Sequence, residues 1–107
     1  MQQRTLGTNG LSVSAIGYGC MGLSGFYGNA QDAESEAVLQ QTFELGVNFF
    51  DTADVYGDGH NEELVGRALN GVRDQLVIAS KCGFLRDADG AMLVNGNPDY
   101  IRSACDA

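Results

Sequence analysis

The feature of this chain that most restricts its fold is a regular alternation of short apolar segments with longer amphipathic ones. The apolar segments lie at 14–19 (SAIGYG), 47–52 (VNFFDT) and 76–79 (LVIA), and each has the length of a strand buried on both faces. The stretches 32–45 and 61–69 between them place apolar residues at helical spacing. Strands that alternate with helices through short connections form right-handed βαβ units, so we expect an α/β fold with a parallel sheet.

Turn residues predict two hairpins outside this alternation. An Asn-Gly pair at 9–10 readily takes the backbone angles of a tight turn, so the short segments 4–6 and 11–13 should pair as an N-terminal hairpin. An Asp-Gly pair at 89–90 predicts a second hairpin in the polar stretch after the third apolar segment.

Capping residues predict where the helices begin and end. Asp32 is expected to cap the first helix, and Asn70-Gly71 should end the second in the left-handed conformation. Asn97 followed by proline and aspartate predicts the start of a third helix over 98–107.

Length, charge and cysteine content limit the class of protein. The 107 residues fit one domain, and the formal net charge of −8 predicts repulsion from nucleic acid and anionic membranes. No apolar run approaches the roughly 20 residues of a membrane span. The three widely spaced cysteines form no metal-binding pair, and we expect them to be buried free thiols. These features predict a soluble cytoplasmic protein with no metal site and neither a nucleic-acid nor a membrane partner.

Three residues with complementary proton chemistry follow the second and third apolar segments. Asp51 ends one segment, Tyr56 lies in the loop after it, and Lys81 follows the other. The carboxyl ends of neighbouring parallel strands meet at one edge of the sheet, where α/β active sites form. An ammonium stabilises a nearby phenolate, and a carboxylate can hold the ammonium in place. The set predicts a relay that protonates a carbonyl oxygen while an external donor supplies hydride.

Each of these residues also has a common structural role. An aspartate after a strand often caps a turn, a loop tyrosine often packs, and a lysine is usually a solvated charge. Their joint placement at consecutive strand ends favours the functional interpretation.

Other motifs give weaker indications. The glycines at 17, 19 and 22 match GxGxxG, but the segment does not open directly into a helix, and Asp51 comes too late to be the acidic partner of a dinucleotide site. Lys81 is likewise too distant for a kinase glycine loop. The DADG segment at 87–90 lacks the later glutamate of a calcium loop, so we interpret it as a turn.

Several long motifs resemble the N-terminal third of the aldo-keto reductase family. They are RTLGTNGLSVSAIGYGCMGLSGFYG at 4–28, GVNFFDTADVYGDGHNEELVGRAL at 46–69, LVIASKCGF at 76–84 and NPDYIRSACDA at 97–107. The resemblance covers nearly the whole chain. It implies a partial (β/α)8 TIM barrel, with an N-terminal hairpin, three parallel strands alternating with helices, and a truncated third helix. It also implies NADPH-dependent reduction of aldehydes or ketones.

The resemblance assigns roles to individual residues. Asp51 matches the family's catalytic aspartate, Tyr56 its proton-donating tyrosine, and Lys81 the lysine that assists proton release. Met21 and Gly22 match a loop on the nicotinamide side of NADPH, where Asp51 is also expected to contact the cofactor.

The same resemblance predicts an incomplete site. The family's fourth catalytic residue, a histidine after the next strand, has no counterpart in the 107 residues, and the family's main phosphate contacts lie on later strands. His60 follows Tyr56 too closely to replace that histidine, and we expect it to cap the second helix or be solvated. We therefore expect residues 1–107 to be a single incomplete domain that is inactive alone and binds NADPH weakly.

Three parallel strands would leave two open sheet edges and an uncovered apolar face. We therefore expect self-association into a homo-oligomer. Two other hypotheses stay open: a subunit that joins missing pieces into an active oxidoreductase for a small carbonyl substrate, and a non-catalytic nucleotide-binding remnant.

Overall fold

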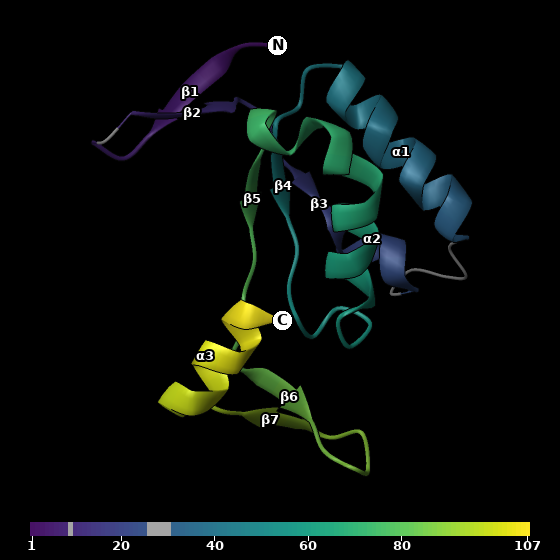
Figure 1. The fold of residues 1–107 in the computed structure, drawn as a ribbon, viewed down its shortest axis with the longest axis vertical. Helices are drawn as coiled ribbons and strands as arrows, with labels where there is room; N and C mark the ends of the chain where they lie inside the picture. Colours follow the sequence, from purple (N-terminus) through teal and green to yellow (C-terminus); the bar gives the residue numbers. More distant parts are fainter. Residues whose placement is uncertain (9, 26–30) are drawn as a thin grey trace.

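A parallel three-stranded sheet and two helices form the body of the molecule (Figure 1). The computed structural model describes residues 1–8, 10–25 and 31–107. The sheet has the order β3-β4-β5 with parallel pairing throughout, and its strands are β3 (Tyr18–Gly19), β4 (Phe49–Asp51) and β5 (Val77–Ala79). The helices α1 (Asp32–Glu44) and α2 (His60–Leu69) pack against each other beside it. The predicted alternation of strands and helices is confirmed.

The core lies between the sheet and these helices. Phe50, the middle residue of β4, is fully buried and lies opposite Ile78 of β5. Side chains alternate along a strand, so Phe49 and Asp51 face the other side of the sheet, where they are only half-buried. The buried core residues are Cys20, Leu39, Val47, Phe50, Leu64, Val65, Leu69 and Leu76.

Two hairpins and a third helix extend from opposite ends of this body (Figure 1). Strands β1 (Gln3–Leu6) and β2 (Leu11–Ser14) pair antiparallel, as the N-terminal turn residues predict. Strands β6 (Phe84–Arg86) and β7 (Met92–Val94) form the second predicted hairpin. Helix α3 (Pro98–Asp106) begins as predicted, with the Asn97 side chain accepting the backbone N–H of Asp99. Asn9 and part of the glycine-rich loop, 26–30, lie outside the described residues.

The predicted strand at 14–19 is divided in the structure. Ser14 ends β2, and only Tyr18 and Gly19 pair with β4. The Ser14 N–H donates to Asn48 Oδ1 at 2.6 Å, and its hydroxyl donates to the Ile16 carbonyl at 2.7 Å. These bonds turn the chain from the hairpin into the sheet, which an apolar pattern alone does not show.

The predicted cap of α1 is wrong. Gln31 is the N-cap residue and makes no side-chain capping bond, whereas Asp32 is the first helical residue. The Asp32 carboxylate instead accepts a hydrogen bond from Arg67 at 3.0 Å and lies 2.9 Å from His60 Nε2. The Asp32 carboxylate therefore binds side chains of α2 and not the backbone N–H groups of its own helix, because its bond with Arg67 is charge-assisted and stronger.

Helix α2 ends at Leu69 as predicted, but the left-handed conformation expected after it is wrong. Asn70 has right-handed backbone angles, and the chain continues as the 3-10 helix η2 (Asn70–Gln75) before entering β5. A 3-10 turn commonly tightens a helix end, and it removes the need for a left-handed stop residue here. None of the described helices combines the length and apolar character needed to cross a membrane.

Candidate active site

The structure brings the three predicted catalytic residues together at the carboxyl edge of the sheet. Asp51 is the last residue of β4 and pairs with Ala79 of β5, two residues before Lys81. Lys81 Nζ donates to Asp51 Oδ1 at 2.7 Å. The same nitrogen lies 5.0 Å from the ring centroid of Tyr56. Parallel strand register and a short loop therefore place a carboxylate, an ammonium and a phenol in one group.

Lys81 is held as a cation by this arrangement. Partial burial lowers its pKa, but hydrogen bonds to Asp51 and Tyr56 outweigh burial and raise the pKa above its ordinary value of 10.5. Its nitrogen also donates to the Thr52 carbonyl at 2.6 Å. The stabilising contribution of these contacts is present below pH 10.5 and is lost as pH rises through the raised pKa.

The loop that carries Tyr56 is closely folded against its neighbours. The Tyr56 N–H donates to the Ala53 carbonyl at 3.2 Å, and the Gly59 N–H donates to the Asp54 carbonyl at 2.8 Å. Gly57 has a φ of +62°, and a Cβ atom there would lie 3.1 Å from Ser24 Cβ. Conformation and space together require glycine beside Tyr56.

Replacing Gly57 by alanine should lower the free energy of unfolding by about 1–3 kcal/mol, because a side chain would strain the left-handed backbone and press on Ser24. Gly66→Ala is the matched control, since Gly66 lies in α2 with open space around it and should gain about 0.5–1 kcal/mol. Urea unfolding followed by circular dichroism measures both values. Equal effects of the two substitutions would contradict the described loop geometry.

A buried asparagine that the sequence interpretation missed ties the site to the preceding loop. Asn61 is fully buried, and its Oδ1 accepts the Thr52 hydroxyl at 2.6 Å. Its Nδ2 donates to the Cys20 carbonyl and to Ser24 Oγ, both at 2.8 Å. The available signal was a polar residue on the same helical face as Leu64 and Val65.

These bonds fix the 3-10 helix η1 (Cys20–Ser24), which carries two of the three predicted cofactor residues. Met21 and Gly22 are half-buried on this helix. Met21 and Tyr56 line one pocket of about 340 Å³, with Arg86 as the cation among its lining residues. Elsewhere, Arg67 binds Asp32 and Glu36 and Arg102 binds Asp99, so these two arginines are already engaged.

His60 bridges two helices and takes no part in the group around Tyr56. Its Nδ1 lies 2.9 Å from Ser24 Oγ, and its Nε2 lies 2.9 Å from Asp32 Oδ1. Gly59 is the N-cap residue of α2, so His60 does not cap this helix, and its side chain is 39% exposed. Both ring nitrogens are already engaged by side chains of η1 and α1.

The cysteines are free thiols, but only Cys20 is buried. Burial, followed by the charge of Asp51, raises the pKa of the Cys20 thiol to about 12, so this residue is an unreactive core side chain. Cys82 and Cys105 are exposed, contrary to expectation.

Within the described part of the chain, no cluster of His, Cys, Asp or Glu could hold a metal ion. At the DADG segment, Asp87 Oδ1 accepts the N–H groups of Asp89 and Ala91, which makes it the predicted turn.

Comparison with known proteins places these motifs in one family. The model of the aldo/keto reductase family matches residues 15–107. The chain is 44% identical to a probable aldo-keto reductase 1 of Glycine max over 108 residues, which are 99% of the chain and 31% of the relative. It is 41% identical to the aldo-keto reductase yakc [NADP(+)] of Schizosaccharomyces pombe over 98 residues, covering 89% of the chain and 29% of that protein. The chain thus spans about a third of the length of these relatives.

Solved structures give the same result for the fold. The holo form of an aldo-keto reductase from Bacillus halodurans overlaps 99% of the chain with a TM-score of 0.85 and 36% identity, and the chain covers 34% of that protein. A glycerol dehydrogenase from Gluconobacter oxydans overlaps 94% with a TM-score of 0.76 and 27% identity, with 32% of that protein covered. The expected partial (β/α)8 barrel is confirmed, and the described strands do not close it.

Proposed function

Because the chain belongs to the aldo/keto reductase family, we propose that it carries the proton-transfer part of an oxidoreductase site that reduces an aldehyde or ketone with NADPH. The observation that carries this proposal is the contact of Lys81 Nζ with Asp51 at 2.7 Å beside the ring of Tyr56. Membership of the family does not by itself guarantee that these three side chains lie together. Their proximity in this structure supports the proposal that the chain keeps the proton-transfer chemistry.

Each residue has a defined part in the proposed reaction. The Tyr56 hydroxyl gives its proton to the carbonyl oxygen, and the Lys81 ammonium stabilises the phenolate that remains. Asp51 and the Thr52 carbonyl hold the ammonium in place from two sides. NADPH, when bound, supplies the hydride that reaches the carbonyl carbon, so the carbonyl becomes an alcohol and both added hydrogens are accounted for.

The residues present fit one end of that cofactor. Met21, Gly22 and Asp51 would hold the nicotinamide, because η1 and the end of β4 lie together and Met21 shares a pocket with Tyr56. The name of the fission yeast relative includes NADP(+), which favours the phosphorylated dinucleotide. Arg86 is a single cation at this pocket, so phosphate binding by the chain alone should be weak.

We further propose that the 107 residues alone are inactive and self-associate. In the described part of the chain, β3 and β5 each leave one edge of the parallel sheet without a partner strand. Ile16, Phe84 and Val94 are exposed apolar side chains, and open edges with apolar surface favour association. Light scattering at micromolar concentration should give a mass above that of one chain, and a folded monomer would contradict this part of the proposal.

A subunit completed by further strands is the second candidate, and the length of the relatives favours it over a nucleotide-binding remnant. The test joins residues 1–107 to the remaining two thirds of the soybean relative and follows NADPH oxidation with an aromatic aldehyde. We expect turnover from the joined protein, none from the chain alone, and a loss of about 10²–10⁴-fold in Tyr56→Phe.

The matched control for that test is Tyr18→Phe, which removes a phenol hydroxyl from β3 and should leave turnover within a few-fold. Fluorescence titration with NADPH gives a separate reading of binding for every variant. A Tyr56→Phe protein that binds NADPH and keeps its full rate would overturn the proposed role of Tyr56.

A further inference from the structure

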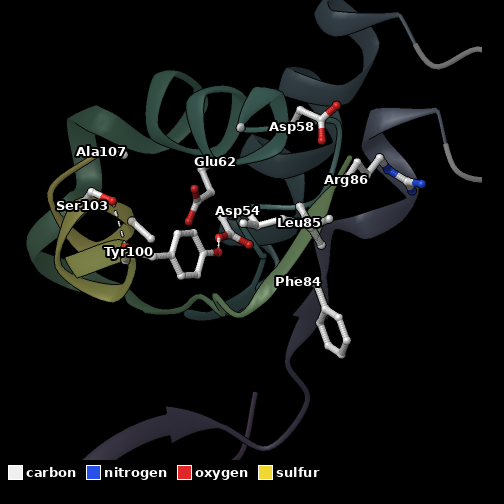
Figure 2. A pocket seen from close by; sticks show the side chains of 12 residues that line it. Asp54, Asp58, Glu62, Phe84, Leu85, Arg86, Tyr100, Ser103 and Ala107 are labelled. Carbon is white, nitrogen blue, oxygen red and sulfur yellow. Dashed lines mark hydrogen bonds between the residues drawn. The ribbon is translucent and has the colours of Figure 1, made fainter. Parts of the chain in front are cut away.

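Tyr100 of α3 joins the two loops that carry the catalytic residues. Its hydroxyl donates to Asp54 Oδ2 at 2.6 Å and accepts the backbone N–H of Gly83 at 3.1 Å. Figure 2 shows the Tyr100 ring pointing from α3 toward Asp54, with Glu62 of α2 nearby. We call these three groups, the Tyr100 hydroxyl, the Asp54 carboxylate and the Gly83 N–H, the Tyr100 brace.

Both partners in the brace are close in sequence to a catalytic residue. Asp54 lies two residues before Tyr56, and Gly83 lies two residues after Lys81. The Asp54 N–H also donates to the Lys81 carbonyl at 3.1 Å. The loops are therefore joined by their backbones, by the Lys81 side chain and through Tyr100.

The brace holds a carboxylate that has few other partners. Asp54 Oδ1 is buried and has no hydrogen-bond partner among the described residues. Asp54 and Tyr100 both line a pocket of about 350 Å³. The bond to Asp54 raises the pKa of Tyr100, so its hydroxyl keeps its proton, and the brace stays intact, through neutral pH. Losing the hydroxyl would leave the carboxylate without this donor and free the loop to move.

We propose that Tyr100 is a positioning residue that fixes the separation of Tyr56 and Lys81 by bridging Asp54 and Gly83. The inference rests on the proposed function, because it matters only if Tyr56 and Lys81 act as a pair. Tyr100 touches neither of them and acts through their loops. A purely structural tyrosine would stabilise α3 without affecting the environment of the Lys81 ammonium.

The test uses the full chain, in which Lys81 is the single lysine among six basic residues, the other five being arginines. Labelling with lysine that carries ¹³C at Cε alone gives one resonance, and its titration reports the Lys81 pKa. Tyr100→Phe removes one hydroxyl and no charge. We expect the Lys81 pKa to fall toward its ordinary value, because the contacts with Asp51 and Tyr56 that raise it would loosen. Hydrogen exchange at the Asp54 amide should also accelerate by roughly 5- to 10-fold, as for the loss of one hydrogen bond.

Ser103→Ala is the matched control, since it removes a hydroxyl of the same helix that donates only to the Tyr100 carbonyl. It should leave the Lys81 titration unchanged. If Tyr100→Phe does not fold, the pair Asp54→Asn and Asp54→Ala replaces it. Both remove the same charge, but asparagine keeps an acceptor for Tyr100, so alanine should lower the Lys81 pKa further.

The outcomes separate the brace from the proposed function. An unchanged Lys81 pKa in Tyr100→Phe, with a lowered one in Asp51→Asn, would overturn the brace and leave the catalytic group intact. Equal effects of Asp54→Asn and Asp54→Ala would overturn the brace as well. If the Lys81 pKa has its ordinary value and Asp51→Asn does not change it, this result would instead contradict the assembled site on which both proposals rest.

Discussion

Replacing Asn61 by leucine should lower the free energy of unfolding by about 3 kcal/mol or more, one of the two largest effects expected in this chain. Leucine has a similar size but cannot accept from Thr52 or donate to Cys20 and Ser24. Each buried polar group left without its partner costs about 1–3 kcal/mol, and the Thr52 hydroxyl and the Cys20 carbonyl lose theirs, while Ser24 Oγ keeps its contact with His60. Urea unfolding followed by circular dichroism gives the value.

Asn70→Leu is the matched control for that substitution, because Asn70 is exposed at the start of η2. It should change stability by no more than about 0.5 kcal/mol. Asn61→Leu should also weaken NADPH binding by the joined protein, since η1 carries Met21 and Gly22. A stability change as small as that of the control would show that the buried network is not formed.

Replacing Phe50 by alanine should lower the free energy of unfolding by about 3–5 kcal/mol. Phe50 is 0% exposed and is the largest fully buried side chain of the core, so alanine would leave a cavity between the sheet and the helices. Small domains have a total stability of about 5–15 kcal/mol, so the variant should lie close to unfolding. It should also lose order at Asp51, the next residue of β4.

Phe84→Ala is the control, because Phe84 is 53% exposed on β6. It should cost no more than about 0.5 kcal/mol, and it removes apolar surface that we expect to promote association. Comparable losses of stability in Phe50→Ala and Phe84→Ala would contradict the location of the core.

The sheet and the meeting of Asp51 with Lys81 could be predicted because both depend on patterns that are local in sequence. Short apolar segments fix the strands, and parallel pairing then brings their carboxyl ends together, which is why Asp51 and Lys81 meet. The Asp-Gly turn of the second hairpin and the Asn97 cap of α3 are likewise determined by neighbouring residues.

The parts that could not be predicted depend on partners distant in sequence. Asp32 seemed suited to cap its own helix, but Arg67 lies 35 positions away and engages its carboxylate. The partners of Asn61 lie on η1 and at the end of β4, and Tyr100 reaches Asp54 across 46 positions. The sequence around a polar residue in a helix does not indicate which distant group will be its hydrogen-bond partner.

Titration of the single ¹³Cε resonance of Lys81 tests directly whether Asp51, Tyr56 and Lys81 form one assembled proton-transfer group. It compares the unmodified chain with Asp51→Asn and Tyr56→Phe. We expect a Lys81 pKa above 10.5 in the unmodified chain and a lower value in each variant, because both partners raise it. An ordinary Lys81 pKa that is the same in all three proteins would show that these side chains do not form one group.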